Sequence, residues 1–445
     1  MVKTPLPPPA TSTLLDAARR NDRLAAVFQA LPEVSGGPYL AWDKLRHKEP
    51  PGDLTPEEWW LATKVARQAA RKMLPTLIDL RHQPFSYVLA DEVLEGVDFI
   101  NRHASGSITI SEQVTNATTR DRYVVNSLIE EAITSSQLEG AATSRRVAKE
   151  MIRSGRDPRD RGERMIFNNF HAMQRIVDLK EEPLTPALIC EIHRIVTDGT
   201  LDDPLSAGKI QDDDADRVAV WGDGQQLLHQ PPPVAELPQR MEALCDFANG
   251  QTPDGFMPPV LRAITVHFMM GFDHYFEDGN GRTARALFYW TLLHNGYWLA
   301  EFLTISRILK QAPSQYAQAY LHSEYDEGDL THFFIYNVKV ISRAINDLHA
   351  YLAAKAAELN EFRRRAAAGP VGLNHRQVAL LEHAVKNPGQ DYTAASHARS
   401  HRVSEQAARN DLRDLERQGL LTWHKLGRQH AWTAPEDLPA RLVDA

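Results

Sequence analysis

The sequence of 445 residues contains only two cysteines and no long hydrophobic run. Cys190 and Cys245 are far apart along the chain and lack the spacing of metal ligands. This scarcity argues against a disulfide-rich secreted fold and favours inert thiols in a reducing compartment. No stretch of 18 apolar residues occurs, and prolines at 5–9 stand where a signal peptide needs an apolar run. We therefore expect a cytoplasmic protein without a membrane partner.

The sequence also lacks a strong excess of charge of either sign. The 50 Lys and Arg residues and 58 Asp and Glu residues give a net charge of −8. A polyanionic partner for the whole chain is therefore not required. With 43% hydrophobic residues, a chain of this length can bury a large core and form two to three domains.

Helical periodicity dominates the chain, so we expect a mostly α protein. Thr55 followed by acids is typical of a helix start. Two short runs around 222–224, followed by prolines, predict a β-hairpin. The expected division is a loosely attached N-terminus at 1–36, a helical extension at 37–115 that packs or dimerises, a core at 116–355, a linker at 356–372, a C-terminal module at 373–435 and a tail at 436–445.

The stretch HYFEDGNGRTAR, at 274–285, is the richest in chemical groups. Gly279 and Gly281 free the backbone around Asn280 to turn its N–H groups toward one point, a nest suited to an anion. Apolar periodicity resumes directly afterwards, so the nest opens a helix whose dipole also favours phosphate. Arg282 and Arg285 are three residues apart, on one helix face, where both can contact the same ligand.

Two further side chains extend this prediction. Asp278 precedes the nest, and an acid there would repel phosphate unless a divalent cation lies between them. Mg²⁺ favours one or two carboxylates together with phosphate oxygens. His274, four residues earlier at the end of the preceding helix, is placed to accept a proton near the phosphate. Phe276 is expected to anchor the loop in the core.

Structural and alternative interpretations compete with this one. A lone GNG is usually a turn, and a lone histidine near a helix end is usually structural; the combination in this order favours a phosphate site. Gly279, Gly281 and Ala284 also match a dinucleotide fingerprint, with Glu301 near the distance of a ribose-binding acid. That fingerprint needs a short strand in front, whereas the segment before His274 is long and helix-periodic.

The loop resembles the signature of the Fic family of adenylyltransferases, H-[P]-F-x-[DE]-G-N-[GK]-R-x-x-R. Every chemical position matches from His274 to Arg285, and Tyr275 replaces the usual proline. The resemblance extends over about 120–352 and implies a Fic-type helical core with a small β-hairpin flap, which holds a target segment by strand addition. Gln211 stands where the family commonly has an arginine.

The resemblance implies nucleotidyl transfer. His274 would deprotonate a Ser, Thr or Tyr hydroxyl of a target protein or of the chain itself, which attacks the α-phosphate of ATP. Asp278 would hold Mg²⁺, while the Gly279–Gly281 backbone, Asn280 and Arg282 would cradle the phosphates. Arg285 would contact the γ-phosphate. Positioning and charge compensation carry most of such catalysis.

A second short motif, SSQLEG, closes a helix in which Val125, Leu128, Ile129 and Ala132 form one apolar face. An acid in the last turn of a helix is disfavoured by the dipole unless it is solvated or paired. The motif resembles the inhibitory [ST]-x-x-x-E-[GN] pattern of the Fic family, matched by Ser135, Glu139 and Gly140. The resemblance implies that Glu139 pairs with Arg285 and obstructs the γ-phosphate. Other family members use this glutamate to position water and remove AMP, and this reverse activity stays open as an alternative for the chain.

The C-terminal module resembles a winged helix-turn-helix of the kind appended to many bacterial Fic proteins. Ser404 is a suitable N-cap, and a small core of Ala407, Leu412, Leu415 and Leu420 is expected. The exposed face of the recognition helix would carry Gln406, Arg409, Asn410 and Arg413. Residues 371–445 contain ten Lys or Arg and nine Asp or Glu, a net of +1, which is weak for DNA. DNA binding and protein docking both stay open.

Two functions of different class follow from the sequence. One is an autoinhibited, Mg-ATP-dependent protein adenylyltransferase, and the other is a DNA-binding regulator that uses the Fic core as a nucleotide sensor. The complete catalytic set favours the enzyme, because a sensor would not need His274. The base pocket is expected around Tyr316 and Tyr320, and the choice among ATP, UTP and CTP is left open, as are the target and the oligomeric state.

Overall fold

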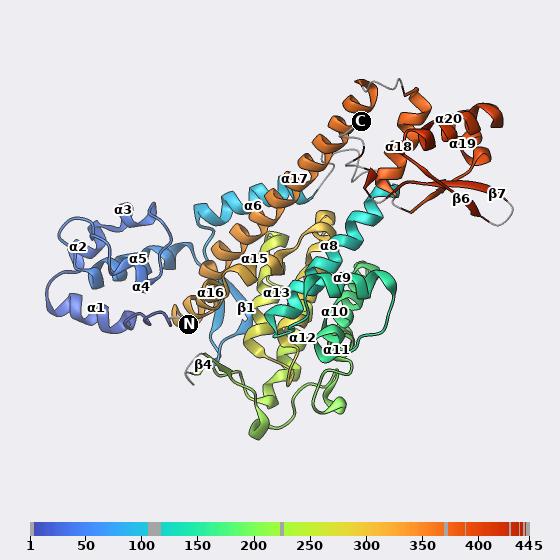
Figure 1. The fold of residues 1–445 in the computed structure, drawn as a ribbon. Helices are drawn as coiled ribbons and strands as arrows, with labels where there is room; N and C mark the ends of the chain where they lie inside the picture. The colour runs from blue at the N-terminus through green and yellow to red at the C-terminus, as the bar shows by residue number, and fades with distance from the viewer. Residues whose placement is uncertain are drawn as a thin grey trace. The chain divides into compact units, whose positions relative to one another are not determined.

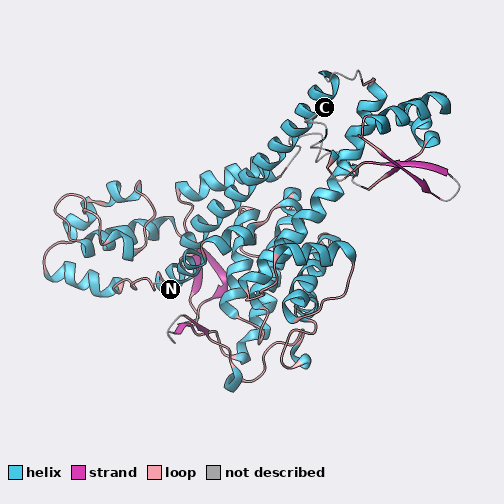
Figure 2. Ribbon diagram, viewed as in Figure 1, coloured by secondary structure: helices cyan, strands magenta, loops and turns pink. Residues whose placement is uncertain are grey.

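The computed structural model describes residues 4–105, 117–222, 227–368, 373–387, 389–426, 429–435, 437, 438 and 441. Helices dominate these residues, as the helical periodicity of the sequence predicted, and strands are few and short (Figure 2). The chain divides into two compact units at Leu348 and His349. Within the described residues, no helix is both long and apolar enough to cross a membrane.

The N-terminal segment is folded, which differs from the expectation of a loose stretch at 1–36. Leu14 and Val27 are buried in one cluster with Trp60. The prolines that suggested a loose segment end before the first helix begins. Thr55 caps the last of these helices in a reciprocal capping box with Glu58. The helices are α1 (Thr11–Arg20), α2 (Leu24–Gln29), α3 (Leu31–Ser35), α4 (Trp42–Leu45) and α5 (Pro56–Ala70) (Figure 1).

The expected helical extension also contains a hairpin. Strands β1 (Lys72–Ile78) and β2 (Pro84–Tyr87) pair antiparallel and precede α6 (Asp91–Ala104). Phe85 is fully buried and packs edge-on against Phe272, with ring centroids 5.0 Å apart. The N-terminal hairpin therefore packs directly against the helix that ends at residues 274–285, which we call the chemical loop.

A buried ionic cluster also joins the N-terminal helices to the core. The Asp326 carboxylate lies 2.7 Å from Lys64 Nζ, 3.4 Å from Arg67 Nη1 and 2.9 Å from His332 Nε2. Asp329 adds a third possible metal ligand here. Two buried cations already neutralise this cluster, so it is a structural ion-pair network rather than a metal site.

The core of the first unit is a layered set of helices. Helix α13 is buried on all sides and packs along α14, while α10 packs against α8 and α11. Burial all round explains why α13 shows no polar face. In α8, Leu128, Ile129 and Ala132 are buried as expected, but Val125 is 40% exposed. The helices are α8 (Ala117–Leu138), α9 (Arg145–Ser154), α10 (Arg161–Asp178), α11 (Pro186–Thr197), α12 (Leu237–Ala248), α13 (Pro259–Asp273), α14 (Asn280–His294), α15 (Ile305–Gln311), α16 (Pro313–Tyr325) and α17 (Thr331–Ala368).

The expected hairpin lies between α11 and α12. Strands β3 (Val220–Trp221) and β4 (Leu227–His229) pair antiparallel, and Val220 lies opposite His229. The predicted turn at 222–224 falls partly outside the described residues. We refer to β3 and β4 as the flap.

The second unit begins inside α17, which continues to Ala368 through most of the expected linker; 369–372 lie outside the described residues. Three helices then pack on an antiparallel sheet in the order β5–β7–β6. Ser404 caps its helix as expected, but Ala408, rather than Ala407, joins the core. The elements are α18 (His375–Lys386), β5 (Asp391–Tyr392), α19 (Ala394–His401), α20 (Glu405–Arg417), β6 (Thr422–Leu426) and β7 (Gln429–Thr433).

Candidate functional site

His274 ends α13 as its C-cap, in the left-handed conformation with φ 50° and ψ 57°. Its Nδ1 lies 3.3 Å from the carbonyl oxygen of Gly271. A carbonyl only accepts hydrogen bonds, so Nδ1 carries the proton and Nε2 carries the lone pair. Burial lowers the pKa of His274 to about 4. The imidazole is therefore neutral near pH 7 and can accept a proton at Nε2.

Gly279 begins α14 with φ 82°, and no side chain caps this helix N-terminus. The first backbone N–H groups of a helix have no partner within the helix, and its dipole is positive at this end. The sequence motif thus opens a helix as expected, and an anion nest at this N-terminus stays a prediction.

Asn280 braces the loop. Its Oδ1 accepts from the backbone N–H of Phe276 at 3.0 Å, and its Nδ2 donates to the carbonyl of the same residue at 2.6 Å. Phe276 is fully buried and stacks on His193, with ring centroids 3.7 Å apart, so it is the expected core anchor. The predicted cradle role therefore falls to the Asn280 backbone, because its side chain is already committed to the loop.

His193 is a site residue that the sequence reasoning missed. Its Nε2 donates to the carbonyl of Asp278 at 2.8 Å, while its Nδ1 accepts from the N–H of Gly208 at 2.8 Å. Burial lowers its pKa to about 4, which keeps this neutral tautomer. His193 lies in the apolar pattern of α11, and nothing in its local sequence distinguishes it from a core histidine.

Arg282 is a fully buried cation with spare donors. Its Nη1 donates to the carbonyl of Val196 at 2.6 Å, but Nε and Nη2 have no hydrogen-bond partner. The nearest acid is Asp278, whose Oδ2 lies 3.6 Å from Nη2. Buried unsatisfied donors on a charged group are costly, so this guanidinium favours an anion in the nest.

Asp278 lies at the edge of the nest with 44% of its side chain exposed. Oδ1 accepts from the N–H of Gly279 at 2.6 Å, and Oδ2 lies 3.7 Å from Arg161 Nη2. A half-exposed carboxylate beside an anion nest fits Mg²⁺ that arrives with phosphate oxygens, because that ion needs few protein ligands. Arg161, at the start of α10, was not predicted, because it is distant in sequence.

Arg285 is held by the second motif. Its Nε donates to Ser135 Oγ at 2.8 Å, and its Nη2 donates to the Ser135 carbonyl at 3.0 Å and to Glu139 Oε1 at 2.8 Å. Burial would lower the pKa of Arg285, but Glu139 outweighs it and the pKa is raised. Gly140, with φ 93°, ends the helix as predicted. The structure therefore contains the ion pair that the resemblance implied.

Glu139 also covers the nest. A Cβ atom built on Gly281 would collide with Glu139 Oε1 and approach Arg285 Nη1 to 3.1 Å. The position therefore requires glycine in this arrangement, and the Glu139 carboxylate lies against the first turn of α14. A carboxylate there occupies a position that also suits phosphate.

Tyr275, which replaces the usual proline, is buried and donates to Asp273 Oδ2 at 2.7 Å. Arg240 Nη1 lies 3.2 Å from the other oxygen of Asp273. The hydroxyl therefore joins a buried network under the loop, which proline could not do. Burial raises the pKa of Asp273 to about 6.

The predicted base-pocket tyrosines lie on α16 against α13. Tyr316 Oη is 2.8 Å from His267 Nε2, and Tyr320 Oη donates to the His267 carbonyl at 3.1 Å. A nucleotide-base contact by either stays a prediction. The dinucleotide interpretation is wrong, because a 15-residue helix precedes the loop instead of a strand and Glu301 is buried.

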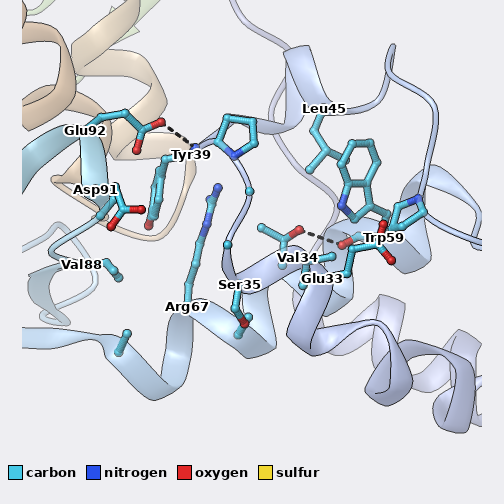
Figure 3. Close-up of a pocket in the computed structure, with 18 of the residues that line it drawn as sticks. Glu33, Val34, Ser35, Tyr39, Leu45, Trp59, Arg67, Val88, Asp91 and Glu92 are labelled. Atoms are coloured by element: carbon cyan, nitrogen blue, oxygen red, sulfur yellow. Dashed lines mark hydrogen bonds between the residues drawn. The ribbon is translucent and has the colours of Figure 1, made fainter.

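Two cavities are candidates for the entrance of a ligand. One of about 790 Å³ lies among the N-terminal elements around Tyr39 and Arg67, and none of the loop residues lines it (Figure 3). A second, of about 690 Å³, is lined by Glu139, Arg161 and Asp278. Only the second opens onto the chemical loop, so it is the candidate entrance.

In the second unit, the predicted recognition-helix residues lie on α20. Gln406, Asn410 and Arg413 are exposed, and Arg409 is half-buried. Gln406 Nε2 donates to Asn410 Oδ1 at 3.1 Å. These side chains can meet a partner, but their geometry does not choose between DNA and protein.

Comparison with known proteins identifies the domain around the loop. Residues 183–292 match the model of the Fic/DOC family, so the chain carries a Fic domain. Over 118 residues the chain is 33% identical to the protein adenylyltransferase Fic of Nematostella vectensis. The aligned segment covers 26% of this chain and 25% of that protein. The chain thus matches only a quarter of that relative's length. The matched family segment contains 274–285 but not Ser135 or Glu139.

Two solved structures align with this chain, and one of them does so well enough to show its fold. A Fic family protein from Desulfovibrio desulfuricans G20 aligns with a TM-score of 0.52 and 17% identity over 79% of this chain and 98% of that one. Fic-1 from C. elegans aligns with a TM-score of 0.46 and 17% identity over 79% of this chain and 90% of that one. The first likeness shows a common fold and nothing about activity.

Proposed function

We propose that the chain is a protein adenylyltransferase that transfers AMP from ATP to a hydroxyl of a target protein or of itself. The observation that carries the proposal is that one loop ends a helix with His274, whose burial keeps it neutral, and begins the next helix with the buried guanidinium of Arg282, whose Nε and Nη2 have no hydrogen-bond partner. A base and a phosphate site in one loop are what nucleotidyl transfer requires.

In the proposed reaction, a Ser, Thr or Tyr hydroxyl oxygen attacks the α-phosphorus and its proton passes to Nε2 of His274. A new P–O bond forms while the bond between the α-phosphorus and the bridging oxygen breaks, and pyrophosphate leaves. Arg282 and the first N–H groups of α14 bind the phosphates, and Arg285 binds the γ-phosphate. Asp278 would hold Mg²⁺, which would offset phosphate charge.

Glu139 is proposed to inhibit this reaction. Its ion pair with Arg285 and its position over Gly281 support the proposal, because both contacts occupy groups that the phosphates need. Productive ATP binding would first have to displace the carboxylate.

Labelled nucleotide tests the proposed function. With the Glu139→Gly variant, ATP labelled at the α-phosphate should mark protein, and ATP labelled at the γ-phosphate should not. Mass spectrometry should find one added AMP, and UTP or CTP in parallel reports the nucleotide preference. Label from the γ position alone would show a kinase and overturn the proposal.

The pH dependence of labelling should reflect the low pKa of His274. An ordinary histidine would become protonated below about pH 6.5 and lose its function as a base. Because the His274 pKa is about 4, the base form persists below about pH 6.5, and we expect that the labelling rate of Glu139→Gly does not fall to half its maximum near that pH. The measurement is the initial rate at saturating Mg-ATP, with circular dichroism to confirm folding. A half-maximal rate near pH 6.5 would contradict it.

The second unit is proposed to be a winged helix-turn-helix, supported by its three helices, its antiparallel sheet and the exposed polar side chains of α20. This unit would bind either DNA or a docking protein. The two candidate functions differ here, because the nucleotide-sensing regulator needs DNA binding and the enzyme does not. Retention of the full chain on DNA that weakens with salt, and is lost in Arg413→Ala, would favour the regulator.

A further inference from the structure

Three consecutive carbonyls at the end of α13 are bonded by two side chains, one on β4 of the flap and one just before β3. His229 Nε2 lies 2.6 Å from the carbonyl oxygen of Phe272. Arg217 Nη2 donates to the carbonyl of Asp273 at 2.5 Å, and Nη1 donates to the carbonyl of His274 at 2.6 Å. Carbonyls at a helix C-terminus lack partners within the helix, and cationic donors there are favourable. We call Arg217 and His229 the carbonyl clamp.

One strand of the flap and the segment before the flap contribute to this clamp. Arg217 lies three residues before β3, and His229 is the last residue of β4. Arg217 Nε also donates to the Pro232 carbonyl at 2.8 Å, and Nη1 donates to Gln211 Oε1. The guanidinium thus bonds the segment on either side of the flap as well as the helix end. The arginine that the resemblance expects at 211 is replaced by a glutamine that contacts this guanidinium.

His229 is fixed at both ring nitrogens. Its Nδ1 lies 2.8 Å from Glu324 Oε2 on α16, and its ring packs against Phe272 with centroids 4.8 Å apart. Because a carbonyl and a carboxylate both accept, the imidazole donates at each nitrogen. Burial opposes this charge, but Glu324 raises the His229 pKa above its ordinary value.

One clamped carbonyl belongs to His274, the residue that the proposed chemistry uses, and the other two belong to the two residues before it. His274 adopts a left-handed conformation that residues with a Cβ atom disfavour, so surrounding contacts must hold it. The Asp273 and His274 carbonyls report the peptide planes on either side of its Cα atom. Fixing both planes fixes the direction of its Cα–Cβ bond, and the contact of Nδ1 with the Gly271 carbonyl then orients the ring.

We propose that Arg217 and His229 are positioning residues that orient the His274 imidazole and couple it to the flap. This inference rests on the proposed function and adds to it how a target segment seated on the flap is aligned with the base. Neither residue needs to touch the nucleotide. A displacement of the flap would therefore shift the carbonyls of Phe272, Asp273 and His274, and with them the His274 imidazole.

The test uses the full chain carrying Glu139→Gly. Arg217→Met keeps an unbranched apolar stem but removes every donor, and should lower kcat for labelling about 10- to 100-fold while KM for ATP changes less than about 2-fold. Arg217→Lys restores one donor and should recover part of kcat. Arg175→Met, which removes an exposed partner of Glu191, is the matched control and should change neither constant. A kcat within about 2-fold in Arg217→Met, or a loss confined to KM, would overturn the clamp.

A second readout does not depend on labelling. The His274 pKa, followed by NMR of the imidazole in the otherwise unchanged chain, should rise from about 4 toward its ordinary value in Arg217→Lys, which keeps the positive charge, because the freed ring meets solvent. Arg217→Met should raise it further, because it also removes a charge that lowers the His274 pKa. An unchanged pKa in Arg217→Lys would overturn the clamp. If Glu139→Gly labels nothing while the pKa rises, the proposed function fails and the positioning contact stands.

Discussion

Replacing Glu139 by glycine should raise self-labelling from α-labelled ATP by about 10- to 150-fold. Glu139 Oε1 bonds Arg285 at 2.8 Å and lies over the first turn of α14. Hydrogen bonds to charged groups contribute about 1.5–3 kcal/mol, and each ~1.4 kcal/mol is a factor of ten. Removing the carboxylate frees Arg285 and the nest together, so the fraction of chains able to bind ATP productively increases by that factor.

Two further variants separate the effect of the Glu139 charge from the effect of its side chain covering Gly281. Glu139→Gln keeps the shape over Gly281 but loses the charge, so it should give a smaller increase than glycine. Glu130→Gln places the same substitution on α8, where Glu130 pairs at the surface with Arg145 and Lys149, and should leave labelling within about 2-fold of the parent chain. Unchanged labelling in Glu139→Gly would show that the contact is not inhibitory.

The chemical loop could be predicted from the sequence because its functional residues lie close together along the chain. Two glycines, an acid and two arginines lie within twelve residues, and helix geometry alone places both arginines on one side of the turn. The pair between Glu139 and Arg285 joins residues 146 apart in sequence, and only the resemblance supplied it. Local pattern predicts what one loop holds, whereas contacts between distant elements need the fold.

The residues that sequence reasoning missed are all of the distant kind. His193 looks like a core histidine on an apolar helix, and it is buried as one; its role comes from the Asp278 carbonyl, 85 residues away. Arg161 and Arg217 are ordinary arginines until the fold brings them to Asp278 and to the end of α13. Asn280 shows the converse, because its motif position suggested a ligand contact while its amide braces the loop.

The prediction of a loose N-terminal segment was wrong for another reason. Prolines and alanines at 5–10 suggested a loose stretch, but Leu14 and Ala18 are spaced four apart, as one face of a helix requires. That face packs into the cluster around Trp60. Composition averaged over thirty residues concealed a short amphipathic helix, whose stability comes from packing rather than from helix propensity.

Replacing His274 by asparagine in the Glu139→Gly chain should lower the labelling rate about 10²- to 10⁴-fold, the usual contribution of a general base. The amide of asparagine does not accept a proton near neutral pH, so the attacking hydroxyl would lose its activation. The affinity for Mg-ATP, measured by calorimetry, should stay within about 3-fold, because the nest, Arg282 and Arg285 are untouched. His171→Asn on the exposed face of α10 is the matched control and should label like its parent.

Asparagine is the sharper substitution at this position because of the backbone. His274 has φ 50° and ψ 57°, a conformation that asparagine tolerates and alanine does not. A loss of activity in His274→Ala could arise from a shifted loop, whereas the asparagine variant keeps the C-cap and removes only the imidazole. If His274→Asn labels within about 10-fold of its parent while still binding ATP, the hydroxyl proton leaves by another route and the assigned base is wrong.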